Sequence, residues 1–358
     1  MKKIIRWIII VTILIVVILL VVRLVQDSNI GTNASENQLI AAAKKYYNEK
    51  PHLLPSANYG MERVTSDVLI ERGYLKQTTD QYGAPKSCSS YITVTNVNNE
   101  YFYNPYVDCG IKNDTLLLYD HLVSLAKEET KDGTNGLFIF GNKYVFRGDK
   151  PNNYIEFAGK NWRIIQIEED KSIKLMYNGN QAVSRVWDDR FNLEKNEILG
   201  VNKYEISRIK DYVTTYYNKS DNFSNKSKSK LTFINLCIGE RDIEDKTTDG
   251  SAECQKIFDN QFIGLPSVNE YLNASNDPNC PTTMMSCKNY NFMAAFKSYW
   301  SITPVKGTTH KVFRIYPNEG LISRDAIGKH YAHFVVSLKS DVAILSGDGS
   351  KSNPYVLK

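Results

Sequence analysis

The chain has 358 residues, of which 42% are hydrophobic and 23% are charged, which is enough for two ordinary domains and an anchor and excludes extensive disorder. The net charge of +5 is mild, and no block of Lys and Arg occurs beyond the N-terminus. We therefore expect no nucleic-acid partner.

The first predicted element is a transmembrane helix within residues 1–27. Lys2, Lys3 and Arg6 precede an apolar run that Arg23 ends, and residues 4–22 would contact membrane lipid over roughly 28 Å of helix. A cleavable signal peptide is the alternative, although the run lacks the small residues of a cleavage site. The basic residues predict a single-pass protein of the cell membrane with a cytoplasmic N-terminus and the bulk of the chain extracellular.

Residues 28–113 are predicted to form a small α+β module. A helix with an apolar stripe ends before Pro51, and a short helix is expected at Ser66–Arg72. Two β-rich runs meet at Asn98-Asn99, a pair that suits a two-residue hairpin turn. Cys88 and Cys109 lie equally far from that turn, so we predict that they form a disulfide across the open end of the hairpin.

Residues 114–136 are predicted to be a helical connector, and residues 137–358 a larger domain. Its opening stretch, Tyr144–Tyr177, has the alternation of a three-stranded meander with a turn at Gly159-Lys160-Asn161. Further elements are expected as a helix over Glu205–Asn218, a loop over Lys219–Lys230, a capping box formed by Ser267 with Glu270, and strands at Ser298–Ile302, Lys311–Tyr316 and Phe334–Leu338.

All six cysteines follow the predicted anchor, and none lies in a C-x-x-C pair. Disulfides in an oxidising compartment are therefore expected rather than a metal site. Beyond Cys88 and Cys109, the residues expected to be bonded are Cys237, Cys254, Cys280 and Cys287, whose pairing stays open.

Two stretches of the chain resemble known families. The helix AAAKKYYNEKPHLLP, the segment VLIERGYLK and the C…YVDC hairpin resemble pilin-like surface proteins of low-GC Gram-positive bacteria and mollicutes. The apolar run lacks the glycine and glutamate that flank a prepilin cleavage point. The resemblance implies a pilin-like module and, as one alternative function, a structural subunit of a surface appendage.

In the larger domain, PNNYIEFAGKNWRII, IGLPSVNEYLNAS, YWSITP and FVVSLKSDVAILSGDGSKSNPYVL follow in this order. They resemble a family of extracellular domains of Gram-positive bacteria and mollicutes, similar to the C-type-lectin-like and formylglycine-generating-enzyme-like folds. The resemblance implies an irregular α+β domain whose first and last strands pair. The segment Ala343–Leu357 is then expected beside the opening meander.

The same resemblance suggests a ligand face made of loops. Trp187, Asp188 and Asp189 are the nearest match to a lectin ligand or cation site, and Tyr299 and Trp300 are candidate stacking platforms. The lectin Glu-Pro-Asn and Gln-Pro-Asp motifs are missing, and Gly347-Asp348-Gly349-Ser350 is better explained as a turn than as a calcium loop. We therefore expect neither a metal ion nor a cofactor.

An enzyme is a weaker prediction. His310, His330 and His333 lie close to Asp325 and Asp341 in sequence, but no G-x-S-x-G or H-E-x-x-H motif accompanies them. No cysteine follows Cys287, so the reactive pair of formylglycine-generating enzymes is missing. The sequence thus favours a membrane-anchored extracellular binding or adhesion protein for a glycan, a cell-wall polymer or a protein. An appendage subunit and a surface hydrolase remain the alternatives.

Overall fold

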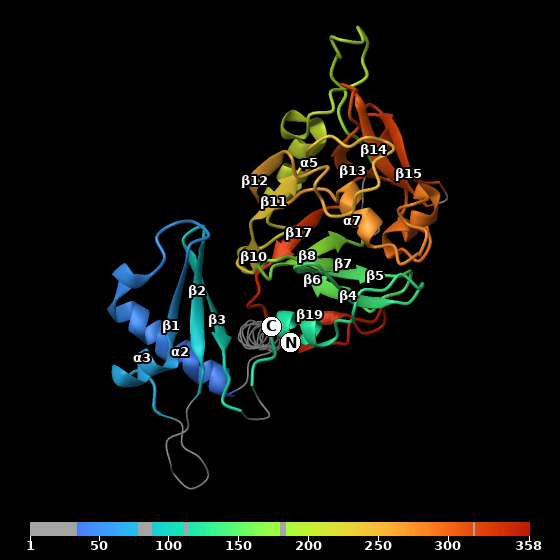
Figure 1. Cartoon of the computed structure of the whole chain (residues 1–358). Helices are drawn as coiled ribbons and strands as arrows, with labels where there is room; N and C mark the ends of the chain where they lie inside the picture. The colour runs from blue at the N-terminus through green and yellow to red at the C-terminus, as the bar shows by residue number, and fades with distance from the viewer. Residues whose placement is uncertain (1–33, 78–87, 111–113, 180–183, 318) are drawn as a thin grey trace, which may run out of the picture. The chain divides into compact units, whose positions relative to one another are not determined.

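The computed structural model describes residues 34–77, 88–110, 114–179, 184–317 and 319–358 (Figure 1). The chain forms two compact units, Met1–Thr95 with Tyr103–Thr115 and Lys358, and Asn96–Phe102 with Leu116–Leu357. Its content of 21% helix and 33% strand confirms the mixed α+β class. No helix of the described ranges is long and apolar enough to cross a membrane, and the predicted anchor at residues 4–22 lies outside them.

The first unit packs one long helix on a small sheet. The predicted stripe Leu39, Ala42, Ala43, Tyr46 and Tyr47 of the helix α2 is buried in one cluster with apolar residues of the strands, and the helix ends before Pro51, as expected. The elements are α2 (Ala34–Glu49), η1 (Pro51–Leu53), β1 (Met61–Thr65), α3 (Ser66–Glu71), β2 (Tyr91–Val97) and β3 (Glu100–Tyr106), with sheet order β1-β2-β3.

The hairpin of β2 and β3 turns at the predicted pair. Asn98 and Asn99 both have positive φ, 54° and 64°, which is the backbone of a two-residue type I′ turn. The Asn96 side chain accepts a hydrogen bond from Asn99 N at 2.9 Å and supports the turn. At the open end Cys88 and Cys109 are bonded, with their Cα atoms 4.3 Å apart. The disulfide predicted from the hairpin register is confirmed.

The second unit is organised by a nine-stranded sheet that contains the opening meander (Figure 1). The turn between its first two strands is Ala158-Gly159, since both residues have positive φ and the next two already belong to the second strand. The turn predicted one residue later is therefore wrong. The order β10-β17-β8-β7-β6-β19-β18 comprises Leu231–Thr232, Val335–Leu338, Ile173–Tyr177, Lys160–Ile167, Tyr154–Phe157, Tyr355–Leu357 and Ile344–Ser346, with β5 (Lys143–Arg147) pairing with β4 (Gly136–Phe140) and β7.

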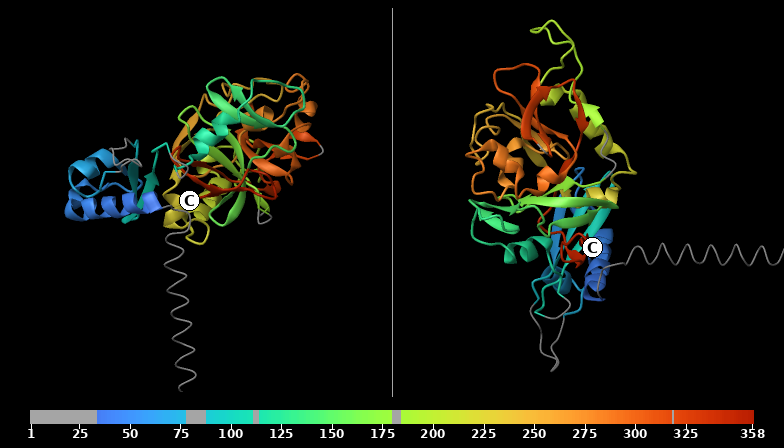
Figure 2. Two further views of the ribbon diagram at one scale, coloured as in Figure 1. Left: turned by 90° about the horizontal axis from the view of Figure 1, so that it is seen from below. Right: turned by 90° about the vertical axis from the view of Figure 1, so that its right-hand side faces the viewer.

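The end of the chain closes this sheet against its beginning. Strand β19 pairs in parallel with β6, Tyr355 opposite Ile155, and β18 pairs with β19. In both views of Figure 2, green strands of the meander run beside red C-terminal segments. The expected position of the segment Ala343–Leu357 is thus confirmed. The turn before β19 depends on Gly347 at φ 97° and on Asp348, whose carboxylate accepts from Ser350 N at 2.9 Å.

A second sheet and short helices complete the unit. The five-stranded sheet has the order β15-β14-β13-β16-β9, which is Gly320–Asp325, Lys311–Tyr316, Tyr299–Pro304, Lys329–Tyr331 and Ser184–Val186. The remaining elements are the pair β11 (Ile234–Cys237) and β12 (Ile257–Gln261), the helices α4 (Leu118–Ser124), α5 (Arg208–Asn218), α6 (Asn225–Lys228) and α7 (Val268–Asn273), and the 3-10 turns η2 (Tyr204–Ile206), η3 (Met284–Lys288) and η4 (Phe292–Ala295).

Two of these elements differ from expectation. The connector is helical only over Leu118–Ser124, because the backbone of Lys127 bonds with strand β4 instead of continuing a helix. The predicted loop Lys219–Lys230 contains the short helix α6, whose N-cap is Ser224.

The capping box of Ser267 and Glu270 is confirmed at the start of α7. The four remaining cysteines pair as Cys237–Cys254 and Cys280–Cys287.

Replacing Cys88 and Cys109 with serine should destabilise the first unit. The bridge closes a loop with a sequence separation of 21, for which the chain-entropy model gives about 3 kcal/mol. Thermal unfolding followed by a probe in the first unit should show a clear fall in midpoint. An unchanged midpoint would contradict a stabilising role for this disulfide.

Replacing Gly347 with alanine should destabilise the second unit. The added Cβ would collide with the Pro354 carbonyl oxygen and would also have to adopt a left-handed φ. Gly141 is the matched control, because it has φ +57° but nothing within 4 Å of a built Cβ. Gly141→Ala should cost about 1 kcal/mol in urea unfolding and Gly347→Ala at least about 3 kcal/mol. Equal losses would show that the closing turn tolerates side chains.

Candidate functional site

The loop that starts at Trp187 is held by two of the predicted site residues. Trp187 is fully buried and donates from Nε1 to the Ser301 carbonyl at 3.2 Å. Asp188 is also fully buried, and its carboxylate accepts from the Arg190 guanidinium at 2.7 Å and from Val201 N at 3.0 Å. Asp188 therefore connects both ends of this loop, and its two carboxylate oxygens already accept hydrogen bonds from the protein.

Asp189 differs from its two neighbours. Its carboxylate is half exposed and lies 3.3 Å from Nε of Arg208, which is itself exposed. An ion pair of this kind on a surface contributes little to stability. A ligand role for Asp189 stays a prediction.

The two other predicted residues, Tyr299 and Trp300, are fully buried. The Tyr299 hydroxyl donates to the Met293 carbonyl at 3.2 Å, and Trp300 Nε1 donates to the Arg185 carbonyl at 2.9 Å. A ring without an exposed face offers no stacking platform in this conformation. Their ligand role is untested, while their packing and hydrogen bonds give them a scaffold role.

The three histidines of the hydrolase alternative make separate contacts. His310 Nε2 lies 3.4 Å from an Asp325 oxygen, whereas His333 Nδ1 lies 2.9 Å from the Tyr177 carbonyl. Burial lowers the pKa of His333 to about 4, so this ring is neutral at pH 7. His330 contacts the Ser298 hydroxyl at 3.2 Å. In the described part of the chain, no carboxylate completes a Ser-His-carboxylate set around these rings.

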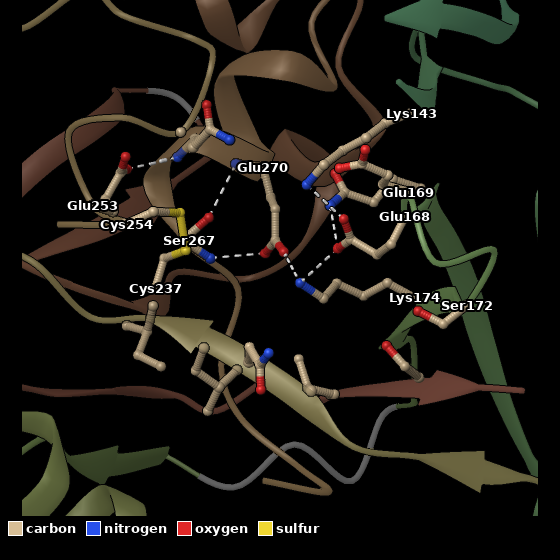
Figure 3. A pocket seen from close by; sticks show the side chains of 18 of the residues that line it. Lys143, Glu168, Glu169, Ser172, Lys174, Cys237, Glu253, Cys254, Ser267 and Glu270 are labelled. Atoms are coloured by element: carbon tan, nitrogen blue, oxygen red, sulfur yellow. Dashed lines mark hydrogen bonds and ion pairs between the residues drawn. A yellow bond between two sulfur atoms is a disulfide. The ribbon is translucent and has the colours of Figure 1, made fainter. Parts of the chain in front are cut away.

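A cavity of about 510 Å³ lies elsewhere in the second unit, among strand β11, the turn between β7 and β8, the start of α7 and the Cys237–Cys254 disulfide (Figure 3). Its lining includes hydrogen-bonding side chains from all these segments. They are Lys143, Gln166, Glu168, Glu169, Asp170, Ser172, Lys174, Asn235, Asp249, Glu253, Ser267, Asn269 and Glu270, with Ser337 added by strand β17. The cavity is therefore suited to a polar ligand.

Lys174 forms the centre of a charge network in this cavity. It is the one charged residue of strand β8, and its Nζ lies 2.5 Å from Glu270 Oε1 and 3.1 Å from Glu168 Oε1 (Figure 3). Glu168 also pairs with Lys143 at 2.6 Å. The second Glu270 oxygen accepts from Ser267 N at 2.9 Å, which is half of the capping box of α7. The network thus connects the meander with the helix.

The environment keeps the two central groups charged. Burial acts to lower the pKa of Lys174, but the carboxylates of Glu270 and Glu168 outweigh it and raise the pKa above its usual value. Burial acts to raise the pKa of Glu168, but Lys174 and Lys143 outweigh it and lower the pKa to about 2. Lys174 is therefore a cation at neutral pH and a poor nucleophile, and Glu168 is a poor proton donor.

The opposite wall is a loop fixed by the Cys237–Cys254 disulfide. Inside it, the buried Arg241 donates to both Glu253 oxygens at 3.1 Å and to the Thr247 carbonyl at 2.6 Å. Glu253 also accepts from Asn269 N at 2.9 Å. Burial raises the pKa of Glu253 although Arg241 acts against it, but this residue is 0% exposed and cannot deliver a proton to a ligand.

Phe233 is the one aromatic residue among the described residues that line the cavity. Its side chain is 44% exposed, and its ring packs on Phe262 with the centroids 4.4 Å apart. Around it, Asn235, Ser172 and Asn269 add hydrogen-bonding side chains to the lining. The lining thus combines one partly exposed aromatic residue with polar side chains, several of which are held by hydrogen bonds and ion pairs.

Sequence reasoning did not identify this cavity as a site. One signal was available, since Lys174 interrupts the apolar strand Ile173–Tyr177, and a lysine inside a buried strand requires a carboxylate partner. The partner, Glu270, lies 96 residues away in sequence. The capping-box motif singled out Glu270 as a helix-capping residue. The spacing of the two residues in the sequence does not predict that Glu270 contacts Lys174.

Replacing Lys174 with methionine should change the acid response of the second unit. A native pKa of Glu168 near 2, below the value of 4.5 expected when unfolded, gives stability that is present above pH 4.5 and lost as the pH falls toward 2. Without Lys174, burial would raise that pKa and this loss should shrink. At pH 7 the variant should lose about 3 to 5 kcal/mol, because the buried Glu270 loses its ion-pair partner and Glu168 keeps only Lys143.

Lys143→Gln is the control, because Lys143 is 44% exposed and should matter much less. Urea unfolding between pH 3 and pH 7 measures both variants. Parallel stability curves for Lys174→Met and the wild type would show that Lys174 does not set the pKa of Glu168.

Comparison of the chain with protein-family models, with curated proteins and with solved structures found no match. The resemblances to pilin-like proteins and to C-type-lectin-like domains therefore stay predictions. The function of the cavity has to be inferred from its own residues.

Proposed function

We propose that the chain is a membrane-anchored extracellular binding protein whose second unit holds a glycan in the cavity beside Lys174. Residues 4–22 serve as the anchor. The observation that carries the proposal is the combination of an exposed Phe233 ring with a lining of fixed polar groups.

The cysteines support an extracellular location. All six are paired in three disulfides, and no free cysteine remains. Disulfides persist in oxidising compartments and are rare in the cytosol. One of them, Cys237–Cys254, lines the cavity and holds the loop that carries Glu253. An oxidising location would therefore also preserve the shape of the cavity.

The paired charges at the centre of the cavity fit a neutral polyhydroxyl ligand. Lys174, Lys143 and Glu168 already pair with one another or with Glu270, so no strong isolated charge remains among them to select an ion. Sugar hydroxyls can both donate to carboxylates and amide oxygens and accept from amide N–H groups. The apolar face of a sugar ring can pack on an aromatic side chain such as Phe233.

The test is a glycan array probed with the full-length chain, followed by titration with the best ligand. Phe233→Ala should weaken that ligand about five- to tenfold, corresponding to roughly 1 to 1.4 kcal/mol of lost ring contact. The matched control is Phe191→Ala, since Phe191 is 48% exposed, much as Phe233 is, but does not line the cavity. It should bind like the wild type.

Circular dichroism and thermal melts should show that both variants remain folded. A chain that binds no glycan would contradict the proposal. A glycan that binds equally well to Phe233→Ala and Phe191→Ala would place the binding site outside this cavity.

A further inference from the structure

One face of the five-stranded sheet gathers basic side chains. The register pairs Trp300 with Arg314, Val312 with Arg324, and His330 with Arg185. Side chains of directly paired residues lie on the same face, and alternate residues of a strand share a face. The rings of Trp300 and His330 touch, with centroids 4.7 Å apart, which places His330 on the same face.

Arg314 is 9% exposed at the centre of this face but has weak partners. Its Nη1 lies 3.1 Å from Ser298 Oγ and 3.2 Å and 3.3 Å from the two ring nitrogens of His330. An atom nearly equidistant from both nitrogens lies over the ring face, not along a lone pair. The Arg314 Nε is buried and has no hydrogen-bond partner.

Other buried arginines of this unit have better acceptors. Arg147 pairs with Glu129 at 2.9 Å and Arg241 with Glu253 at 3.1 Å. Arg163 donates to the Asn153 side-chain oxygen and the Pro151 carbonyl. Among the described residues, no carboxylate forms an ion pair with Arg314. A buried cation without an anion is costly, so this position is incomplete as it stands.

The charges around His330 have the same sign. Arg314 and Arg324 face it from β14 and β15, Arg185 is its register partner on β9, and Glu319, in the turn between β14 and β15, acts on Arg314. Burial and the two arginines Arg314 and Arg324 lower the pKa of His330 to about 4. Although Ser298 and His330 are in contact, an imidazolium beside arginines is disfavoured, so this pair is poorly suited to general-base catalysis.

We propose that Arg314, Ser298 and His330 form a binding site for a phosphate or sulfate group on this face of the sheet. Such an oxyanion accepts hydrogen bonds from a guanidinium, a hydroxyl and an imidazole N–H, and it supplies the negative charge that Arg314 lacks. Arg324 adds positive charge at the side, whereas the Arg185 guanidinium lies over the Tyr212 ring, 4.7 Å from its centroid. The site is separate from the glycan cavity, whose lining shares none of these residues.

The direct test is calorimetric titration of the full-length chain with inorganic phosphate and inorganic sulfate. Arg314→Met, which keeps an unbranched side chain but removes the guanidinium, should weaken binding at least about tenfold, as expected for lost charge-assisted hydrogen bonds. The matched control is Arg208→Gln, because Arg208 is 59% exposed and lies beside Asp189. Its affinity should stay within about twofold of wild type.

A second readout uses the unaltered chain, with a variant needed only for assignment. Proton NMR should give a pKa for His330 near 4 without ligand, and phosphate should raise it because an anion offsets the arginines. A His330→Gln sample assigns the signal. Since the bound state then takes up a proton, the affinity for sulfate, whose charge does not change in this range, should increase as the pH falls from 7 toward 5.

Methyl phosphate distinguishes the source of the group. Binding of methyl phosphate as well as inorganic phosphate would support a site for a phosphate substituent on a larger molecule, whereas binding of inorganic phosphate alone would support a site for the free ion. The proposal would be overturned if neither phosphate nor sulfate binds and the His330 pKa stays unchanged. Equal weakening by Arg314→Met and Arg208→Gln would also overturn it.

Discussion

The parallel pairing of β19 with β6 is the constraint on which the second unit depends. It places Tyr355 opposite Ile155 and so joins the last strand of the chain to the opening meander. Strand β8 of that meander carries Lys174, and strand β17 pairs with β8 on its other side. Because a sheet transmits position through its hydrogen bonds, the closing strand helps to hold the cavity wall in place.

Two buried cations show how differently the interior treats charge. Lys174 has two carboxylates within 3.1 Å, which keep it charged despite its burial. Arg314 contacts a hydroxyl, an imidazole and the Tyr316 ring, and burial lowers its pKa. The first is a complete structural network. The second has no ion-pair partner among the described residues, although Glu319 lies close enough to act on its pKa.

Three of the residues predicted to bind a ligand lie in the core. Trp187, Asp188 and Trp300 were predicted from the resemblance to C-type-lectin-like domains, and all three are fully buried. Their hydrogen bonds hold the loop after β9 and the neighbouring strands. Phe233, by contrast, lies in a stretch with no recognisable motif and is partly exposed at the cavity. Exposure depends on what packs above a residue, and sequence does not state it.

The sequence by itself determined what depends on neighbours along the chain. The Asn98-Asn99 turn, the Cys88–Cys109 disulfide and the capping box of α7 follow from φ preferences and short spacings, and all three are present. Only the tertiary structure decided which distant residues meet, such as Lys174 with Glu270 and Arg314 with His330. The physical reason is that these pairs form through strand register and helix packing across the core. In the unfolded chain, Lys174 and Arg314 could pair with many other side chains, and the sequence does not specify which pair will form.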